Sequence, residues 1–542
     1  MIHNCAFPLL FSIDLNCDTS PYFANNFISM KSLFCLLSFC IVEVSLTAQP
    51  TIQWQKSLGG TSSEEARCIY QTNDSGYIIS GFTSSNNGNI FGNHGGIDFW
   101  VVKLDNEGSI QWSKTLGGTD NEWAYSIEQT HDGGYVLAGF TQSNDGDVSG
   151  NQGSKDAWVV KLTDIGTVQW QKTFGGSDWD EAGSIRQTSD SGYIIAGRSN
   201  STNGDVLGNH GGFDFWIVKL NNMGTIQWTK SLGGSMNDIA YSVRQTQDGG
   251  YIAVGETQSN DGDVTGNHGS TDYWLVKLST EGEIEWQKAL GSNSLDRPND
   301  VHQTSDGGYI VAGVASANNG DVTGHHGGYD YWVVKLSSFG IIEWQRALGG
   351  SGEDFAQAIF PTNDGGCIIA GPTQSNNGDV LNNDGGQDIW LIKLNNVGNI
   401  QWQKTLGGTQ AESANSIQQT NDVGYVLAGY AWSNNGDVSG NHGAQDFWIV
   451  KLSPESSPTS EIQSQPVEIF PNPAQNSISL QIQAQESILN VQIHDLLGRK
   501  LCHQSIQTDA QIDISALPKG LYLLTATTPS GKVFSGKFCK QN

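Results

Sequence analysis

The stretch "DFWIVKL", residues 446–452, decides the fold, because near-copies of it recur along the chain at constant spacing. Its tryptophan closes a series placed 58 residues apart: Trp100, Trp158, Trp216, Trp274, Trp332, Trp390 and Trp448. The tryptophan of a second phrase, "IQWQK", keeps the same period: Trp54, Trp112, Trp170, Trp228, Trp286, Trp344 and Trp402. A fixed period of this kind, without insertion or deletion, is typical of a repeat architecture.

Each 58-residue unit reads as four short strands. A segment similar to "ARCIYQT" comes first, followed by a "DGG" turn, "GYIIAG", a long polar loop, "DFWVVKL", a short turn and "IQWQKSL". These runs are rich in Val, Ile, Tyr and Trp, and none shows a long 3.6-residue apolar period. In the third strand apolar side chains fall on both faces, which predicts sheets stacked face to face.

Four strands per unit predict an all-β protein with a seven-bladed β-propeller over residues 49–452. The chain opens with a lone fourth strand, "TIQWQKSL", and the last unit ends on a third strand, so pairing of the two would close the ring. An open solenoid is the alternative, although it would need distinct capping repeats. The polar loops and the connectors between units are expected on one acidic face, where function usually lies.

The N-terminus carries a targeting signal. From Met30 the sequence "MKSLFCLLSFCIVEVSLTAQP" has the layout of a secretory signal peptide and is too short for a spanning helix. Residues 30–48 are therefore predicted to be the signal, and residues 1–29 a non-native extension ahead of the true start codon. No transmembrane segment is predicted in the mature chain.

The charge balance excludes one class of partner. The formal net charge is −28 and the pI is near 4.5. Such a surface repels nucleic acid and anionic membranes, so no nucleic-acid partner is predicted.

A different kind of domain follows residue 452. Residues 453–465 form a Ser/Pro/Gln/Glu linker, and residues 466–542 alternate as a small β-sandwich does. Phrases such as "VEIFPNPAQNSISLQI", "ILNVQIHDLLGRKL" and "ALPKGLYLLTAT" resemble the type IX (Por) secretion C-terminal sorting domain of Bacteroidetes. The resemblance is carried by Pro471, Asn472, Pro473, Asp495, Gly498, Arg499, Leu517, Gly520, Tyr522, Lys537 and Lys540. It implies passage through the periplasm, the type IX machinery as a partner, and release or attachment at the cell surface.

The polar loop "SNNGDVSGNHG", residues 433–443, is a candidate calcium site, because Asn and Asp oxygens beside Gly turns suit this ion. One position of the loop carries an aspartate in six units: Asp147, Asp205, Asp263, Asp321, Asp379 and Asp437. The first unit has Asn89 there. The alternative is that these residues build Asx-turns. Calcium is therefore possible, and no cofactor is required.

Residues that break the repeat are the candidate ligand-binding residues. Trp123, Trp179 and Trp432 are additional aromatics in or beside the loops, and carboxylates stand close to them in the sequence: Glu122, Asp180 and Glu181. Tryptophan beside carboxylates often holds sugar rings, whereas the alternative is that each Trp packs a loop. Arg297 and Pro298 also depart from the pattern, and drift in a redundant scaffold explains them.

These features predict a secreted or cell-surface binding and adhesion module for extracellular glycans or proteins. No catalytic residues are identified, because sevenfold repetition argues against a unique constellation, and an enzyme is not favoured. Two alternatives stay open. One is a glycan-active, endoglucanase-like hydrolase that uses a pair of loop carboxylates. The other is a purely structural surface protein.

Overall fold

The computed structural model describes residues 49–383, 385–455, 465–481, 488–494, 500–507, 511–528 and 532–541. The predicted N-terminal extension and signal, most of the linker, and Asp495, Gly498 and Arg499 lie outside the described residues. Within the described ranges the protein is all-β. None of these segments forms a helix that is long and apolar enough to cross a membrane.

Seven antiparallel sheets of four strands each occupy the described part of residues 52–452. Their first strands are β2 (Glu64–Gln71), β6 (Glu122–Gln129), β10 (Asp180–Gln187), β14 (Asp238–Gln245), β18 (Asp296–Gln303), β22 (Ala358–Pro361) and β26 (Glu412–Gln419). The second strands are β3 (Tyr77–Thr83), β7 (Tyr135–Thr141), β11 (Tyr193–Ser199), β15 (Tyr251–Thr257), β19 (Tyr309–Ala315), β23 (Cys367–Thr373) and β27 (Tyr425–Ala431). The third strands are β4 (Asp98–Leu104), β8 (Asp156–Leu162), β12 (Asp214–Leu220), β16 (Asp272–Leu278), β20 (Asp330–Leu336), β24 (Asp388–Leu394) and β28 (Asp446–Leu452). The fourth strands are β5 (Ile110–Leu116), β9 (Val168–Phe174), β13 (Ile226–Leu232), β17 (Ile284–Leu290), β21 (Ile342–Leu348), β25 (Ile400–Leu406) and, from the start of the chain, β1 (Ile52–Leu58).

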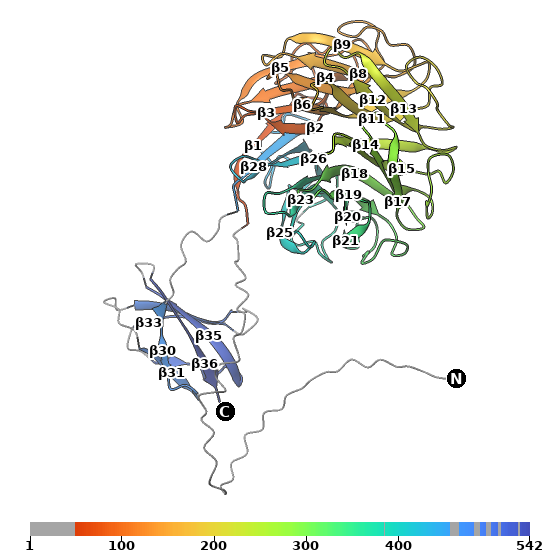
Figure 1. Cartoon of the computed structure of the whole chain (residues 1–542). Helices are drawn as coiled ribbons and strands as arrows, with labels where there is room; N and C mark the ends of the chain where they lie inside the picture. The colour runs from red at the N-terminus through yellow and green to blue at the C-terminus, as the bar shows by residue number, and fades with distance from the viewer. Residues whose placement is uncertain are drawn as a thin grey trace, which may run out of the picture. The chain divides into compact units, whose positions relative to one another are not determined.

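The two ends of this region meet in one sheet, as the strand phases predict. β1 pairs antiparallel with β28, placing Leu58 opposite Phe447, so the last sheet has the order β1-β28-β27-β26. Each sheet contacts the next along the chain, and β2 of the first sheet contacts β27 of the last. Figure 1 shows the sheets arranged around a common centre, with first strands such as β2, β14 and β18 toward the inside and β9, β13 and β17 at the rim. The arrangement is propeller-like.

The third strands are buried along their whole length because a neighbouring sheet covers each face. Trp274 of β16 packs against Phe215 of the preceding sheet, with ring centroids 4.5 Å apart. Trp100 makes the equivalent contact with Phe447 at 4.4 Å, across the meeting of the first and last sheets. All seven third-strand tryptophans are 0% exposed. A strand covered on both sides reads as a continuous apolar run, which explains the "DFWIVKL" pattern.

Each third strand also contains a buried lysine. The lysine at the sixth position of the strand donates from Nζ to the aspartate of the "DGG"-type turn of its own unit, at 2.8–3.0 Å: Lys103, Lys161, Lys219, Lys277, Lys335, Lys393 and Lys451. Burial alone would raise the pKa of Asp190, but hydrogen bonds from Thr188 and Lys219 lower it to about 2. The turn aspartate therefore stays ionised and neutralises a buried ammonium group.

The C-terminal region contains two further sheets. One has the order β29 (Gln465–Pro466), β36 (Val533–Lys540), β35 (Gly520–Thr527), β32 (Ile488–His494) and β33 (Lys500–Gln507). The other has the order β30 (Glu468–Phe470), β31 (Ser477–Gln481) and β34 (Ile512–Asp513). Both sheets contribute buried side chains to one apolar core, among them Ile469, Ile478, Val491, Leu524 and Phe538.

Candidate functional site

The seven units differ most along their first strands. The third residue of every third strand is Trp and the sixth is Lys, whereas three positions of the first strands carry almost no repeated residue. The second position holds Glu65, Trp123, Glu181, Ile239, Arg297, Phe355 and Ser413. The fourth position holds Arg67, Tyr125, Gly183, Tyr241, Asn299, Gln357 and Asn415. The seventh position holds Tyr70, Glu128, Arg186, Arg244, His302, Phe360 and Gln418.

All seven fourth-position residues, with three of the second position, line a cavity of about 330 Å³ where the first strands converge. We call it the axial pocket, and its polar lining is Arg67, Tyr125, Glu181, Arg198, Tyr241, Arg297, Asn299, Gln357 and Asn415. All seven units contribute to the lining. A neighbouring cavity of about 410 Å³ shares Arg67, Arg297, Gln357 and Asn415 with it. The axial pocket is therefore polar and asymmetric, and it adjoins a second hollow.

The pocket lies at the end of the first strands that adjoins the polar loops. In each unit a backbone N–H of the connector donates to a loop side chain, as from Thr119 to Asp145 Oδ1 at 2.9 Å and from Thr409 to Asn435 Oδ1 at 2.9 Å. The prediction that connectors and long loops share one face is thereby confirmed.

Two ion pairs involve residues that line the axial pocket. Arg67 Nε lies 2.9 Å from Glu65 Oε1, and Arg198 Nη2 lies 2.8 Å from Glu181 Oε2. Glu181 also accepts from Lys155 Nζ at 3.2 Å and from Trp179 Nε1 at 2.6 Å. Both carboxylates are therefore held by two or more donors, since Asn415 Nδ2 donates to Glu65 Oε1 at 2.9 Å as well.

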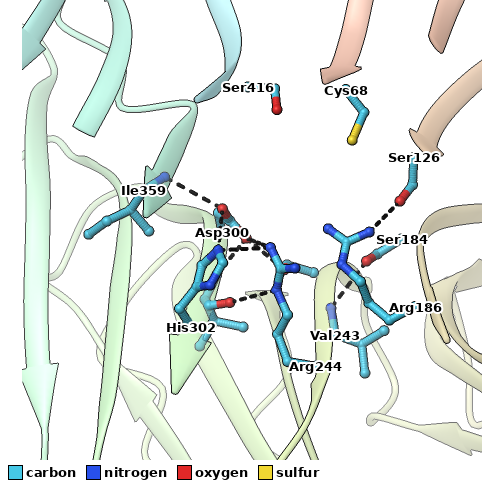
Figure 2. A network of polar contacts seen from close by, with 12 residues as sticks. Cys68, Ser126, Ser184, Arg186, Val243, Arg244, Asp300, His302, Ile359 and Ser416 are labelled. Carbon is cyan, nitrogen blue, oxygen red and sulfur yellow. Dashed lines mark hydrogen bonds and ion pairs between the residues drawn. The ribbon is translucent and has the colours of Figure 1, made fainter. Parts of the chain in front are cut away.

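Deeper along the first strands lies a second, smaller cavity of about 110 Å³, beside a polar cluster that we call the arginine network: Arg186, Arg244, Asp300 and His302. Figure 2 shows both guanidinium groups turned toward the same space, with Cys68 and Ser416 across it. Arg244 Nη2 lies 3.4 Å from Asp300 Oδ1 and 2.8 Å from His302 Nε2.

Backbone and hydroxyl groups complete the network. Asp300 accepts from Ser242 Oγ at 2.8 Å, and Arg186 Nη1 donates to Ser126 Oγ at 2.7 Å and to the carbonyl oxygen of Ile185 at 2.6 Å. These contacts join the unit of β6 to that of β10 and the unit of β14 to that of β18. The Val243 N–H donates to Ser184 Oγ at 3.4 Å and so joins the two pairs.

Electrostatics fix the protonation of this network. Burial would raise the pKa of Asp300, but His302 and Arg244 hold it well below its ordinary value. Burial and the adjacent Arg244 lower the pKa of His302 to about 4. At neutral pH His302 is therefore an uncharged imidazole whose Nε2 can accept from Arg244, and Asp300 is a carboxylate.

The structure gives Glu122 and Asp180 a different place from the predicted ligand surface. Both are 0% exposed. Glu122 accepts from the Gly118 N–H at 2.8 Å and from Thr141 Oγ1 at 2.8 Å, and Asp180 accepts from the Gly176 N–H at 2.7 Å. The same position is a carboxylate in every unit: Glu64, Glu122, Asp180, Asp238, Asp296, Asp354 and Glu412. Because the carboxylate recurs in every unit, Glu122 and Asp180 belong to the repeated scaffold. The 58-residue period of the sequence could have shown this.

The other predicted ligand residues divide between two places. Glu181 lines the axial pocket. Trp123 and Trp179 stand beside it: Arg67 lies 5.7 Å from the Trp123 ring centre, and Arg198 lies 4.9 Å from that of Trp179. Both rings are half-buried, Trp123 by stacking on Phe82 at 4.5 Å. Trp432 is 39% exposed.

The six loop aspartates proposed for calcium share a backbone contact. Each accepts from a glycine N–H thirty residues earlier at 3.2–3.4 Å, the first of them Asp147 from Gly117. Asn89 does the same with Gly59 at 3.1 Å, which shows that an uncharged acceptor suffices for this bond. Among the described residues no group of three or more His, Cys, Asp or Glu side chains is arranged to hold a metal ion. Calcium binding stays a prediction.

The described residues of the sorting motif tie strand ends together. Asn472 donates from Nδ2 to the carbonyl oxygen of Lys537 at 3.0 Å and accepts from the Cys539 N–H at 2.9 Å. The Tyr522 hydroxyl donates to the carbonyl oxygen of Pro518 at 2.6 Å, and Gly520 pairs with Lys540. Pro471 and Pro473 follow cis peptide bonds.

Comparison with known families identifies this C-terminal region. Residues 468–541 match the model described as "Secretion system C-terminal sorting domain". The resemblance read from the sequence is thus confirmed for the tail. The sorting domain implies interaction with the type IX secretion machinery, and it indicates export to the cell surface or secretion.

Similarity elsewhere in the chain is remote. The regulatory protein FlaEY of Caulobacter vibrioides is 22% identical over 397 residues, 66% of this chain and 41% of FlaEY, so the chain spans about two fifths of that relative's length. Among solved structures, BBS1N in complex with ARL6DN has a TM-score of 0.40 at 9% identity, covering 76% of this chain and 99% of that one. The extracellular domain of BT4673, assigned to a hybrid two-component system of B. thetaiotaomicron, has a TM-score of 0.28 at 9% identity, with 88% and 68% covered. Likenesses this weak carry no argument about function.

Proposed function

We propose that the exported protein is a closed seven-bladed β-propeller that acts as a binding module, and that the axial pocket takes its extracellular ligand, a glycan or a protein. The tail supplies the route of export, and the propeller supplies the binding surface. The ligand site is then the centre of the loop face and not the whole of that face.

The observation that carries the proposal is the concentration of non-repeating residues on the pocket wall. A sevenfold scaffold can be filled by sevenfold-repeated side chains, as the third-strand Trp and Lys residues demonstrate. The axial pocket instead presents arginines, tyrosines, amides and a glycine from successive units. A polar, concave and asymmetric surface of this kind is what binding one particular ligand requires.

Binding is favoured over hydrolysis by the state of the pocket carboxylates. Glu181 is held by Lys155, Arg198 and Trp179, and Glu65 is held by Arg67 and Asn415. A general acid has to release a proton to the leaving group and a nucleophile has to approach the sugar, and a carboxylate saturated by fixed donors does neither readily.

The test is a screen of the full exported chain against glycans and surface proteins, with two variants. Gly183→Tyr places in the pocket the residue that neighbouring units carry as Tyr125 and Tyr241, so it should fill the cavity and keep the fold. Trp432→Ala removes the exposed loop tryptophan instead. We expect Gly183→Tyr to weaken ligand binding at least tenfold and Trp432→Ala to leave it within twofold.

The opposite ranking of the two variants would place the ligand on the outer loops. Release of new reducing ends from a bound polysaccharide would contradict the binding-module proposal and favour the hydrolase.

A further inference from the structure

Arginines are gathered at the axis of an otherwise acidic chain. The sequence has seven arginines against a net charge of −28. Six lie within residues 49–452, and five of these line the axial pocket or the smaller cavity beneath it: Arg67, Arg186, Arg198, Arg244 and Arg297. The sixth, Arg346, lies on the fourth strand β21. This placement gathers guanidinium groups at the axis, where Glu65, Glu181 and Asp300 balance part of their charge.

Four of the five axial arginines have partners inside the protein. Arg67 pairs with Glu65, Arg198 pairs with Glu181, and Arg186 and Arg244 belong to the arginine network. Their positions are explained by these contacts.

Arg297 is different. Within the described part of the chain its guanidinium group makes no hydrogen bond or ion pair. Its Nε is buried without a hydrogen-bond partner, as are those of Arg67 and Arg186. The carboxylate of Glu256 acts on it electrostatically, since burial raises the pKa of Glu256 and Arg297 lowers it. The side chain borders both the axial pocket and the neighbouring hollow. A guanidinium group with its donors free is suited to a planar anion, because it can give two parallel hydrogen bonds to one carboxylate.

The rest of the lining suits hydroxyl groups. Asn299 donates from Nδ2 to the carbonyl oxygen of Ala356 at 2.7 Å, and Asn415 donates to that of Ala66 at 2.9 Å. These bonds fix the orientation of both amides, and no described residue donates to either Oδ1 atom. Both oxygens can therefore accept from a ligand. Tyr125 and Tyr241 add aromatic rings, against which a sugar ring can pack.

We propose that the axial pocket binds an acidic sugar of the uronic acid class, with the sugar carboxylate on Arg297 and the sugar hydroxyls on Asn299 and Asn415. The pocket volume of about 330 Å³ lies at the small end of ligand sites, in keeping with a ligand of one or two sugar rings. This inference rests on the proposed function and specifies its ligand.

The test is isothermal titration of the full chain with galacturonate and galactose, which differ in having a carboxylate or a hydroxymethyl group at C6. We expect galacturonate to bind at least tenfold more tightly, and the difference to shrink as NaCl is raised. Arg297→Gln should abolish the preference while leaving the affinity for galactose within twofold. Arg346→Gln, the matched control on the outer strand, should leave both affinities unchanged.

Three results would overturn the inference: equal affinity for the two sugars, a preference that survives Arg297→Gln, or no binding of either sugar. Tighter binding of galactose 6-sulfate than of galacturonate would also contradict it, since the group recognised would then be a sulfate. None of these results decides the proposed function, which the screen with Gly183→Tyr tests on its own. A thermal melt of Arg297→Gln checks that the variant is folded.

Discussion

The third strands and the first strands of the seven units are built from the same repeat but obey different constraints. Each third strand lies between neighbouring sheets on both faces, and its Trp and Lys recur in all seven units. Each first strand has only part of its residues in the interior, such as Ala66 and Ile69 of β2, while the rest face the axis. Packing thus fixes the residue type at positions that a neighbouring sheet covers. At the axis, where a ligand can bind, the residue type is free to vary.

The largest effect is expected from truncating a third-strand tryptophan. Trp216→Ala removes a fully buried indole that packs in the core formed with Val136, Val159 and Ile185. It also removes the hydrogen bond from Trp216 Nε1 to Thr229 Oγ1 at 2.8 Å. We expect a loss of about 3–5 kcal/mol in the free energy of unfolding, measured by chemical denaturation.

Two control variants make this a test of the comparison between strands. Trp332→Ala in another sheet should cost about the same, whereas Tyr241→Ala on a first strand should cost about 1 kcal/mol or less. Equal losses for Trp216 and Tyr241 would show that the axial residues are part of the structural core.

The arginine network is the exception among first-strand residues, and it should show an intermediate effect. Asp300→Ala removes the carboxylate that faces Arg244 and His302 and accepts from Ser242. The guanidinium group of Arg244 then loses its nearest counter-charge and keeps only the weaker interaction with Glu128, so we expect a loss of about 3 kcal/mol in unfolding free energy. Arg297→Gln, which breaks no internal bond, should change stability by less than about 0.5 kcal/mol. If the two variants were equally stable, the network would have no structural role.

Much of the fold could be predicted from the sequence because a buried strand has a recognisable pattern of apolar residues. The tryptophan spacing gave the unit length, and the unpaired strands at the two ends predicted the pairing of β1 with β28 that the structure contains. The turn aspartates and the buried third-strand lysines were visible as a repeat too, but their pairing depends on how β3 and β4 are placed. That placement is a property of the tertiary structure, so the pairing could not be predicted from the repeat alone.

The site was predicted only in part, and the reason is a bulge. In six of the seven first strands the register shifts after the third residue, as between Ala66 and Cys68 in β2. A bulge breaks the alternation of inward and outward side chains, so the axial positions cannot be read from a period of two. Drift in a redundant scaffold accounts for Arg297 in the sequence but not for its place in the lining of the axial pocket. Alignment of the seven first strands could have found the variable positions, but not that they face one another.

The smallest expected effect is on the pH dependence of the unfolding free energy, and it tests a difference between the third strands β8 and β12. In five units a histidine four residues earlier contacts the buried first aspartate of the strand, as His210 Nδ1 does Asp214 Oδ2 at 2.7 Å. In the unit of β8 that residue is Gln152, which gives Asp156 only its backbone N–H, at 2.8 Å. Burial, with Asp180 and Asp205 nearby, raises the pKa of Asp156 to about 6, and its Oδ1 has no hydrogen-bond partner.

A raised pKa in the folded state favours the protonated form, so the stability that Asp156 contributes is present at low pH and is lost as the pH rises through about 6. Asp156→Asn removes this titration, and its amide can donate toward Asp180, because both side chains approach the same space over Gly175. We expect a gain of about 1 kcal/mol in unfolding free energy at pH 7.5, about half of that at pH 5, and almost none below the ordinary pKa of 3.8. Burial raises the pKa of Asp214 as well, but the contact with His210 counteracts this, so Asp214→Asn, which loses that contact, should give a smaller gain than Asp156→Asn. A gain of equal size in both variants would mean that the histidine does not stabilise the buried carboxylate, and the third strands would then be equivalent in this respect as well.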